Sequence, residues 1–425
     1  MAHDASKLVN AKSATDLLMR FLAVEGVTGH EAAIGREIVA ALREAGLPKS
    51  AIHFDDANAR IPVPTETGNL IATLPGTVAG PRLLFMTHMD TVPLCAGAKP
   101  LRKGDRIVAA GETALGGDNR TGCAVLVTLA ATLLKHGLPH PPLTFLFTVR
   151  EESGLYGARH LNPADLGEPV MGFNFDGKLA TDVILGAVGA ERWEVEIKGK
   201  ASHAGVAPEK GISATAVASL AIADAVRSGW FGKVEKSDFA DSVKKSGRMA
   251  DKGRGTSVEP ARGTSNVGPF GGRDGRCAGD ATNVVTDYVF IKGESRSHDA
   301  SFAKAITAAY KAAFAKAASE LTDDAGNGAK VKFASRLDYH PFRMKDDAPV
   351  VRHAAATIAS LGGTPNLRVA NGGLDANWIV RHKVPTVTMG AGQNAIHTVE
   401  EFVDLTEFAA GCRLAVALAT HGAGA

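Results

Sequence analysis

The chain has 425 residues, of which 45% are hydrophobic and 22% charged, and this composition is typical of a globular protein. Its 47 basic and 45 acidic residues leave a net charge of +2, so no global field favours nucleic acid or a membrane surface as a partner. The length exceeds that of one ordinary domain, and we expect two domains, each with its own core.

The N-terminal residues 1–10 are polar and include Asp4 and Lys7, where a secretory signal needs an uninterrupted apolar core. No stretch approaches the ~18 to 20 apolar residues of a membrane helix, so we expect a soluble cytoplasmic protein. The cysteines are Cys95, Cys123, Cys277 and Cys412. They lack the paired spacing of a structural zinc site, and reduced thiols fit best, with a disulfide as the alternative.

Short apolar runs alternate with helix-like segments in much of the chain. Runs typical of buried strands occupy residues 82–86, 143–149, 170–175 and 385–389. Segments with apolar residues at helical spacing occupy residues 121–135 and 406–419. The alternation predicts an α/β fold, in which a mostly parallel sheet carries helices on both faces.

The pattern changes after residue 189. Trp193, Val195 and Ile197 alternate with charged residues, which is typical of an antiparallel strand with one face in water. Helix-like segments at 213–227 and 300–321 and strand-like segments at 286–292 and 330–338 follow. This order predicts a small, ferredoxin-like α+β domain inserted into the larger one. We expect the larger domain at residues 1–188 and 341–425 and the insert at 189–340.

Residues 233–279 are rich in glycine and in charged side chains of both signs. A basic arm that grips a polyanion is one interpretation. Because acidic residues are interleaved and aromatic residues are few, a solvated, mobile insertion is favoured.

Polar residues follow the predicted strands, at the edge where open α/β sheets bind their ligands. His88 and Asp90 follow the first run and lie on the same side of an extended chain. His88 could ligate a metal while Asp90 fixes its tautomer, although a surface pair is the alternative. Glu151 and Glu152 follow the second run, where two carboxylates in a desolvated crevice need cations unless they form a solvated turn.

Three further residues complete the candidate set. Asp176 and His397 follow two other runs, and Asp118 precedes a predicted helix in a glycine-rich turn. Each has an alternative as a helix cap or a loop residue, and a phosphate-binding loop is excluded because the turn lacks the Gly-Lys-Ser/Thr ending. Convergence of five loops on one edge predicts a metal site instead. Histidines and carboxylates without a cysteine pair suit zinc best, with cobalt or manganese as alternatives.

Several motifs, in chain order, resemble one known family. They are His88-Met-Asp90-Thr-Val-Pro93, Gly117-Asp118-Asn119, Glu151-Glu152, Asp176, Ser202-His203-Ala-Gly205 and His397-Thr-Val-Glu400. This set resembles the co-catalytic zinc exopeptidases and amidohydrolases, which include peptidase T, aminoacylase and glutamate carboxypeptidase, and it covers nearly the whole chain. The run Gly372-Gly373-Leu374-Asp375-Ala376-Asn377 resembles the peptidase T branch.

The resemblance implies two Zn²⁺ ions. It places one ion on His88 and Asp176 and the other on Glu152 and His397, with Asp118 bridging both. It also implies that Glu151 is the general base that takes a proton from water, and that Asp90 orients His88.

For the inserted domain, the resemblance implies a lid through which two chains form a homodimer. His203 then reaches a neighbouring active site and donates to the oxyanion, unless it is bound to its own backbone. Arg296 resembles an arginine that grips a substrate carboxylate, with an exposed salt bridge as the alternative. Asn283, Gly373 and Asn377 are further predicted substrate contacts.

The expected function is hydrolysis of short peptides, most specifically by a tripeptide aminopeptidase. A carboxypeptidase or an N-acyl amino acid deacylase is the alternative within the class, and an inactive binding relative is the alternative outside it. Asn119, where relatives often carry an acidic residue, and the segment 233–279 depart from the family pattern and bear on specificity. A serine nucleophile ranks lower because no Gly-x-Ser-x-Gly turn is present. Cys95 and Cys123 lie near the predicted loops, but burial is their commoner fate.

Overall fold

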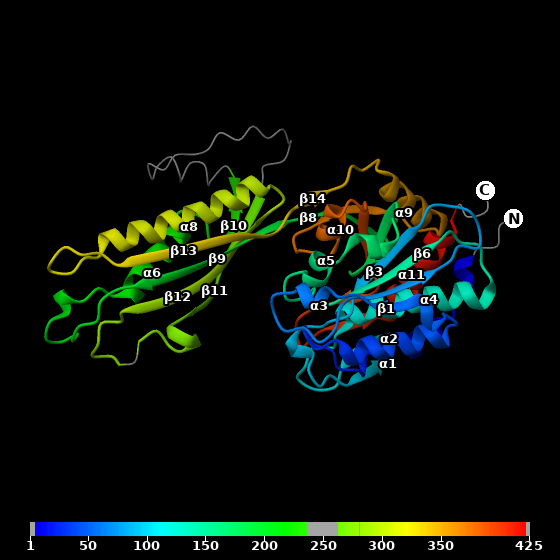
Figure 1. Cartoon of the computed structure of the whole chain (residues 1–425), viewed down its shortest axis with the longest axis horizontal. Helices are drawn as coiled ribbons and strands as arrows, with labels where there is room; N and C mark the ends of the chain where they lie inside the picture. The colour runs from blue at the N-terminus through cyan, green and yellow to red at the C-terminus, as the bar shows by residue number, and fades with distance from the viewer. Residues whose placement is uncertain (1–4, 237–261, 280, 422–425) are drawn as a thin grey trace. The chain divides into compact units, whose positions relative to one another are not determined.

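The computed structural model describes residues 5–236, 262–279 and 281–421. The chain forms two compact units, which are considered separately (Figure 1). Unit 1 comprises Met1–Gly186, Arg343–Ala370 and Leu374–Ala425, and unit 2 comprises Ala187–Phe342 and Asn371–Gly373.

A sheet of nine strands, counted within the described residues, forms the centre of unit 1. Its path is β1 (Ile52–Phe54), β2 (Leu70–Leu74), β6 (Leu143–Thr148), β3 (Leu83–His88), β7 (Met171–Phe175), β16 (Thr386–Met389), β8 (Asp182–Ala187) and β14 (Phe342–Arg343), and β15 (Asn366–Ala370) pairs with β8. Neighbours among β6, β3, β7 and β16 pair in parallel, whereas β2 and β8 flank this group in antiparallel pairing. The predicted α/β class is confirmed, with its parallel pairing at the centre of the sheet.

Side chains of the central strands alternate between two hydrophobic cores, one on each face of the sheet. Phe85 and Phe145 pack in the core under α1 (Ala11–Leu22), α2 (Ala32–Glu44), α4 (Gly117–His136), α9 (Pro349–Ser360) and α11 (Leu405–Thr420). Leu84 and Leu146 pack on the opposite face with α5 (Tyr156–His160) and α10 (Ala376–Arg381). Helix α3 (Ala57–Arg60) is a single turn. Helices therefore cover both faces, as the sequence predicts.

Helix α4 begins with the glycine-rich turn that contains Asp118, and it lies in the interior of unit 1. Residues 117–130 of this helix are all buried, between β3 and the helices α1, α2 and α11. After its polar first turn the helix is almost entirely apolar from Gly122 to Leu133, as expected for a helix that is buried on all sides. The helix ends at Gly137, whose positive φ of 57° lets its N–H reach the carbonyl of Leu133.

A second sheet of unit 1 is small and antiparallel. Its order is β17 (Gln393–Asn394), β18 (Phe402–Asp404), β5 (Arg106–Ala109) and β4 (Pro100–Lys103). Strands β17 and β18 are joined by residues 395–401, and we call this segment the C-terminal connection. It carries His397.

In its described residues, unit 2 is an antiparallel sheet with two helices packed on one face. The strand order is β10 (Gly232–Glu235), β11 (Arg262–Gly271), β12 (Tyr288–Ser297), β9 (Gly189–Lys198) and β13 (Lys330–Tyr339), and the helices are α6 (Ala214–Arg227) and α8 (Ala300–Glu320). Trp193 and Val195 are buried against the helices, whereas Glu194 and Lys198 are exposed. Apart from β10, the order of elements is ferredoxin-like, as predicted.

The prediction of a solvated insertion at residues 233–279 is wrong at both of its ends. Strand β10 covers the first of these residues and β11 covers Arg262–Gly271. Although β11 is glycine-rich, its backbone groups pair with β12, and Ser265 is buried in the sheet. The central part of the predicted insertion, residues 237–261, lies outside the described residues.

Two further expectations concern helices and thiols. In the parts of the chain that the structure describes, every helix is too short or too polar to cross a bilayer. Cys95, Cys123 and Cys412 are buried free thiols, and Cys277 is an exposed one.

Candidate metal centre

Side chains from five segments meet at the carboxyl-terminal edge of the parallel strands. His88 is the last residue of β3, Asp176 follows β7 directly, and Glu152 lies in the loop after β6. Asp118 lies in the first turn of α4, and His397 lies in the C-terminal connection. The structure thus brings all five predicted ligands together within unit 1.

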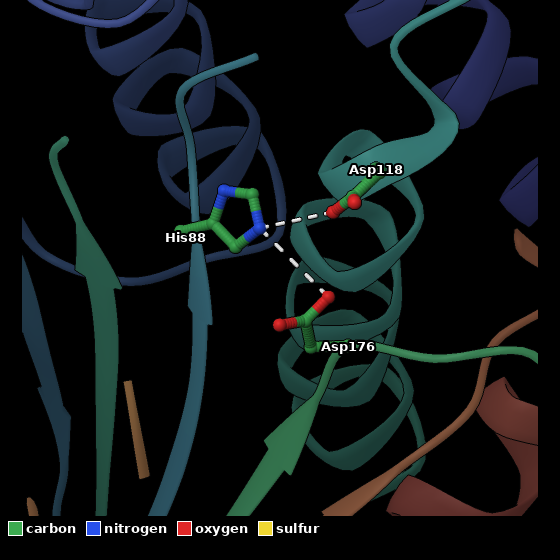
Figure 2. Close-up of side chains that lie close together, drawn as sticks. All are labelled: His88, Asp118 and Asp176. Atoms are coloured by element: carbon green, nitrogen blue, oxygen red, sulfur yellow. Dashed lines mark hydrogen bonds and ion pairs between the residues drawn. The ribbon is translucent and has the colours of Figure 1, made fainter. Parts of the chain in front are cut away.

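His88 is the centre of the buried part of this cluster (Figure 2). Its Nε2 atom lies 3.0 Å from Asp118 Oδ1 and 3.8 Å from Asp176 Oδ1. His88 is 2% exposed, Asp118 6% and Asp176 9%, so water has little access to them. One donor atom from each of these three residues lies within 4.8 Å of the others.

A second group shares Asp118 with the first. His397 Nε2 lies 3.3 Å from Asp118 Oδ2 and 2.9 Å from Glu152 Oε1. The two oxygens of Asp118 therefore face two different imidazoles. Glu151 belongs to a third group of donors, with His88 and Glu152, that also fits within 4.8 Å.

Contacts between histidines and carboxylates in this cluster shift the pKa values of both. Burial lowers the pKa of His88, but hydrogen bonds with Asp118, Asp176 and Asp90 outweigh it and leave that pKa well above its ordinary value. Burial alone would raise the pKa of Asp118, but its contacts with His397 and His88 outweigh burial and bring this pKa below the ordinary value.

The remaining carboxyl groups crowd one another. Burial, together with the charge of Asp118, raises the pKa of Glu152 to about 7 and also raises that of Asp176. Burial raises the pKa of Glu151 well above its ordinary value, and Glu152 and Asp176 add to this. A divalent cation would relieve this repulsion, and imidazole nitrogens with carboxylate oxygens are donors that zinc, cobalt and manganese accept. The residues present therefore fit a metal site.

Asp90 holds the loop of the two glutamates. Its Oδ1 accepts the backbone N–H of Glu151 at 3.0 Å, and its Oδ2 accepts that of Glu152 at 3.2 Å. His88 Nδ1 lies 3.1 Å from the carbonyl oxygen of Asp90 and 3.4 Å from Oδ1. Asp90 thus contacts both the histidine, as predicted, and the two glutamate amides, which the sequence did not indicate.

Three buried acidic residues near the cluster escaped the sequence analysis, and the first is Glu31. Its Oε1 accepts the N–H groups of Gly29 at 2.7 Å and of Arg150 at 3.1 Å. Arg150, next to Glu151, has a φ of 52°, a conformation that costs a non-glycine residue about 1–2 kcal/mol. Glu31 therefore anchors a strained residue beside the predicted base, and nothing in the local sequence pairs it with Arg150.

The other two are Asp375 and Glu401. Asp375, 1% exposed, accepts the hydroxyl hydrogen of Thr148, and its Oδ1 has no hydrogen-bond partner among the described residues. It lies in the run that resembles peptidase T, and that resemblance was the available signal. Glu401 accepts backbone N–H groups that lead into Asp118. Its signal was its position soon after His397.

The residues predicted to contact the substrate are divided between the two units. In unit 2, His203 is exposed, and its Nδ1 accepts the N–H of Gly205 at 3.2 Å. The backbone carbonyl of Asn283 accepts the N–H of Ala204 at 2.8 Å. Arg296 forms an ion pair with Glu294 of the same strand, with Nε 2.8 Å from Oε1.

Two more predicted contacts flank Asp375 in sequence. A Cβ on Gly373 would lie 2.5 Å from the Tyr339 ring, so a side chain does not fit there. In unit 1, the amide oxygen of Asn377 accepts the N–H of Leu374 at 2.9 Å. Gly373 and Asn377 therefore each make a contact within the fold, in addition to the substrate contact that is predicted for them.

Chelator-treated protein is expected to lose stability as the pH rises from about 5 to 8. Burial raises the pKa of Glu152 and of Asp375 to about 7, whereas an unfolded carboxyl titrates near ~4. The folded state then keeps protons that the unfolded state releases, so rising pH favours unfolding by on the order of 3 kcal/mol per group. The raised pKa of His88 acts in the same direction at higher pH.

Thermal unfolding across this pH range, with and without added zinc, measures the effect. Zinc needs deprotonated ligands, so its presence should flatten or reverse the slope of Tm against pH. A Tm that climbs with pH in the chelated protein would contradict the buried, proton-holding cluster.

A sheet edge that gathers two imidazoles and several carboxylates, with no cysteine among them, is the arrangement of a metal-dependent hydrolase. The comparisons with known proteins agree. A model of Peptidase family M20/M25/M40 matches residues 84–421, and the chain belongs to this family of peptidases.

Three similar proteins each match nearly the whole chain. A tripeptidase from Staphylococcus aureus subsp. aureus Mu50 is 27% identical, with a TM-score of 0.81 over 98% of this chain and 99% of that chain. The aminopeptidase PepT from Bacillus cereus ATCC 10987 is 31% identical, with a TM-score of 0.77 over 97% and 99%. Protein YqjE of Bacillus subtilis (strain 168) is 29% identical over 417 residues, which are 98% of this chain and 100% of that protein. The predicted resemblance to metallopeptidases of the peptidase T type is confirmed.

Proposed function

We propose that this chain hydrolyses short peptides with the aid of two zinc ions, and that it is a tripeptide aminopeptidase. One observation carries the proposal. The carboxylate of Asp118 lies between the imidazoles of His88 and His397, at 3.0 and 3.3 Å. Each imidazole has a further carboxylate beside it, from Asp176 and Glu152 respectively. One shared carboxylate, with an imidazole and a further carboxylate on each side, is the arrangement that two ions bridged by Asp118 would need.

These pairs support the ligand assignment that the family resemblance implies. His88 and Asp176 would hold one ion, Glu152 and His397 the other, and Asp118 both. Cobalt or manganese would suit the same donors. When bound, two such ions acidify water and stabilise the negative charge that develops on the carbonyl oxygen.

Glu151 is the proposed general base. It reaches the donor cluster without belonging to either ligand pair, and burial raises its pKa well above the ordinary value, with Glu152 and Asp176 adding to this. A carboxylate in such surroundings readily takes a proton from water at its side-chain oxygen and can return it to the leaving amine. Asp90 fixes the backbone of this loop through the N–H of Glu151.

The roles proposed for unit 2 rest on the family resemblance. Unit 2 would act as a lid through which two chains form a homodimer, and His203 would donate to the oxyanion in the neighbouring site. Arg296 and Asn283 would contact the substrate. Gly373 and Asn377 stay predicted substrate contacts, and the cytoplasmic location stays a prediction from composition.

A panel of substrates tests the assignment. With zinc present, tripeptides with a free N-terminus should release their N-terminal residue, as the names of the similar tripeptidase and aminopeptidase suggest. The matched controls are the same tripeptides with an acetylated N-terminus, and N-acyl amino acids, with products followed by mass spectrometry. Faster cleavage of the N-acyl amino acids would favour a deacylase, and release of the C-terminal residue would favour a carboxypeptidase.

A further inference from the structure

Glu401 is a buried carboxylate in the C-terminal connection, and it contacts the backbone that leads into Asp118. Its side chain is 2% exposed. Its Oε2 accepts the N–H of Leu115 at 2.8 Å and of Gly116 at 2.9 Å, and its Oε1 accepts the N–H of Asp118 at 3.0 Å. Hydrogen bonds to an ionised acceptor are about twice as strong as neutral ones. Three of them fix the path of the chain into Asp118.

The close approach of Glu401 depends on Gly117. A Cβ at this position would lie 3.2 Å from Glu401 Oε1 and 2.7 Å from Val403 Cγ2. A larger residue would therefore push the start of α4 away from β18 and from the carboxylate. Two segments that are 283 positions apart in the chain meet here because a glycine leaves the room.

The same connection carries His397, which needs support of its own. Its φ of 64° is left-handed, and this conformation costs a non-glycine residue about 1–2 kcal/mol. Pairing of β17 with β18 holds the two ends of the connection. Glu401, the last residue before β18, ties it to the start of α4, from which Asp118 projects.

We propose that Glu401 is a positioning residue that sets the spacing between Asp118 and His397, and that its hydrogen bonds to the backbone before Asp118 are required to hold one particular ion. That ion is the one assigned to Glu152, His397 and Asp118, so the inference rests on the proposed function.

The other proposed ion depends less on this spacing. His88 is the last residue of β3, and Asp176 follows β7, which pairs directly with β3 in parallel. The sheet itself therefore sets the distance between these two ligands. Loss of Glu401 should weaken one site selectively, which a general loss of stability would not do.

The test is Glu401→Gln, which replaces one oxygen by an amide nitrogen that donates and cannot accept. At least one of the three backbone N–H groups then loses its acceptor. The unaltered chain should hold two zinc ions after dialysis at fixed free zinc, and the variant between one and two. Competition against a chromophoric chelator should show a Kd raised about 10- to 100-fold at one site and unchanged at the other. Raising free zinc about 100-fold should restore turnover.

Asp404→Asn is the matched control. Asp404 is a carboxylate of the neighbouring strand that also accepts backbone N–H groups, from Thr406 at 2.8 Å and Glu407 at 3.1 Å, but at the start of α11. This variant should keep both ions. If Glu401→Gln does not fold by circular dichroism, Gly117→Ala displaces the same carboxylate while its charge is kept, and it should show the same selective loss.

Two results would overturn the inference. Both Kd values unchanged, or both raised equally, in a folded variant whose parent holds two ions would refute the positioning role and leave the proposed function intact. An unaltered chain that binds fewer than two ions would instead overturn the proposed function, and the inference with it.

Discussion

Replacement of Glu151 by glutamine is expected to lower kcat about 10²- to 10⁴-fold while both ions stay bound. The glutamine has nearly the same shape, and its backbone N–H can still donate to Asp90. What it loses is the oxygen that takes a proton from water. Because Glu151 belongs to neither proposed ligand pair, the metal content should not change.

Measurement of zinc per chain alongside kcat for a tripeptide separates these effects. Glu320→Gln, the same substitution at an exposed surface ion pair with Lys316, is the control and should leave both quantities unchanged. A Glu151→Gln chain that keeps full turnover would remove the residue from the mechanism. A chain that loses metal would instead make Glu151 a ligand.

The second large effect is expected for Asp118→Asn. The carboxylate faces both imidazoles, so a neutral amide weakens both proposed sites at once. We expect bound zinc to fall from two ions toward none and turnover to fall to background. His397→Ala is the informative comparison, because it should cost only the ion shared with Glu152.

Metal content and calorimetric titration with zinc check this contrast. If Asp118→Asn keeps one tightly bound ion, as His397→Ala is expected to, Asp118 does not bridge. Circular dichroism of each variant shows whether a loss of metal reflects a loss of fold.

The sequence predicted the central sheet and the cluster of candidate metal ligands because both depend on local pattern. The apolar runs at 82–86, 143–149 and 170–175 became β3, β6 and β7 within a few residues. Parallel strands end at the same edge, so polar residues that follow them meet there. Convergence of His88, Glu152 and Asp176 follows from that rule. Asp118 reaches the same edge from the first turn of α4, and His397 reaches it from the C-terminal connection. Each of these residues alone was ambiguous.

Strands whose pairing depends on distant partners were missed. Periodicity does not give direction, so the antiparallel flanks formed by β2 and β8 were not predicted. Strand β11 contains several glycines, which are poor strand formers, and its backbone pairing with β12 determines its conformation.

The supporting contacts of the site were missed for the same reason. Glu31 and Arg150 are 119 positions apart, and Glu401 and Asp118 are 283 apart. A carboxylate that binds backbone N–H groups leaves no mark on the sequence of the segment that it holds. Asp90 illustrates the difference between local and distant contacts. Its contact with His88, two positions away, was predicted from their spacing, whereas its contacts with the backbone N–H groups of Glu151 and Glu152 were not.

The proposal that this chain holds two catalytic ions can be tested in one experiment. Zinc per chain is measured together with tripeptide hydrolysis before chelation, after chelation and after zinc is returned. We expect two ions per chain, loss of activity when they are removed and recovery when zinc is added. Full activity in a folded chain that carries no metal would contradict it.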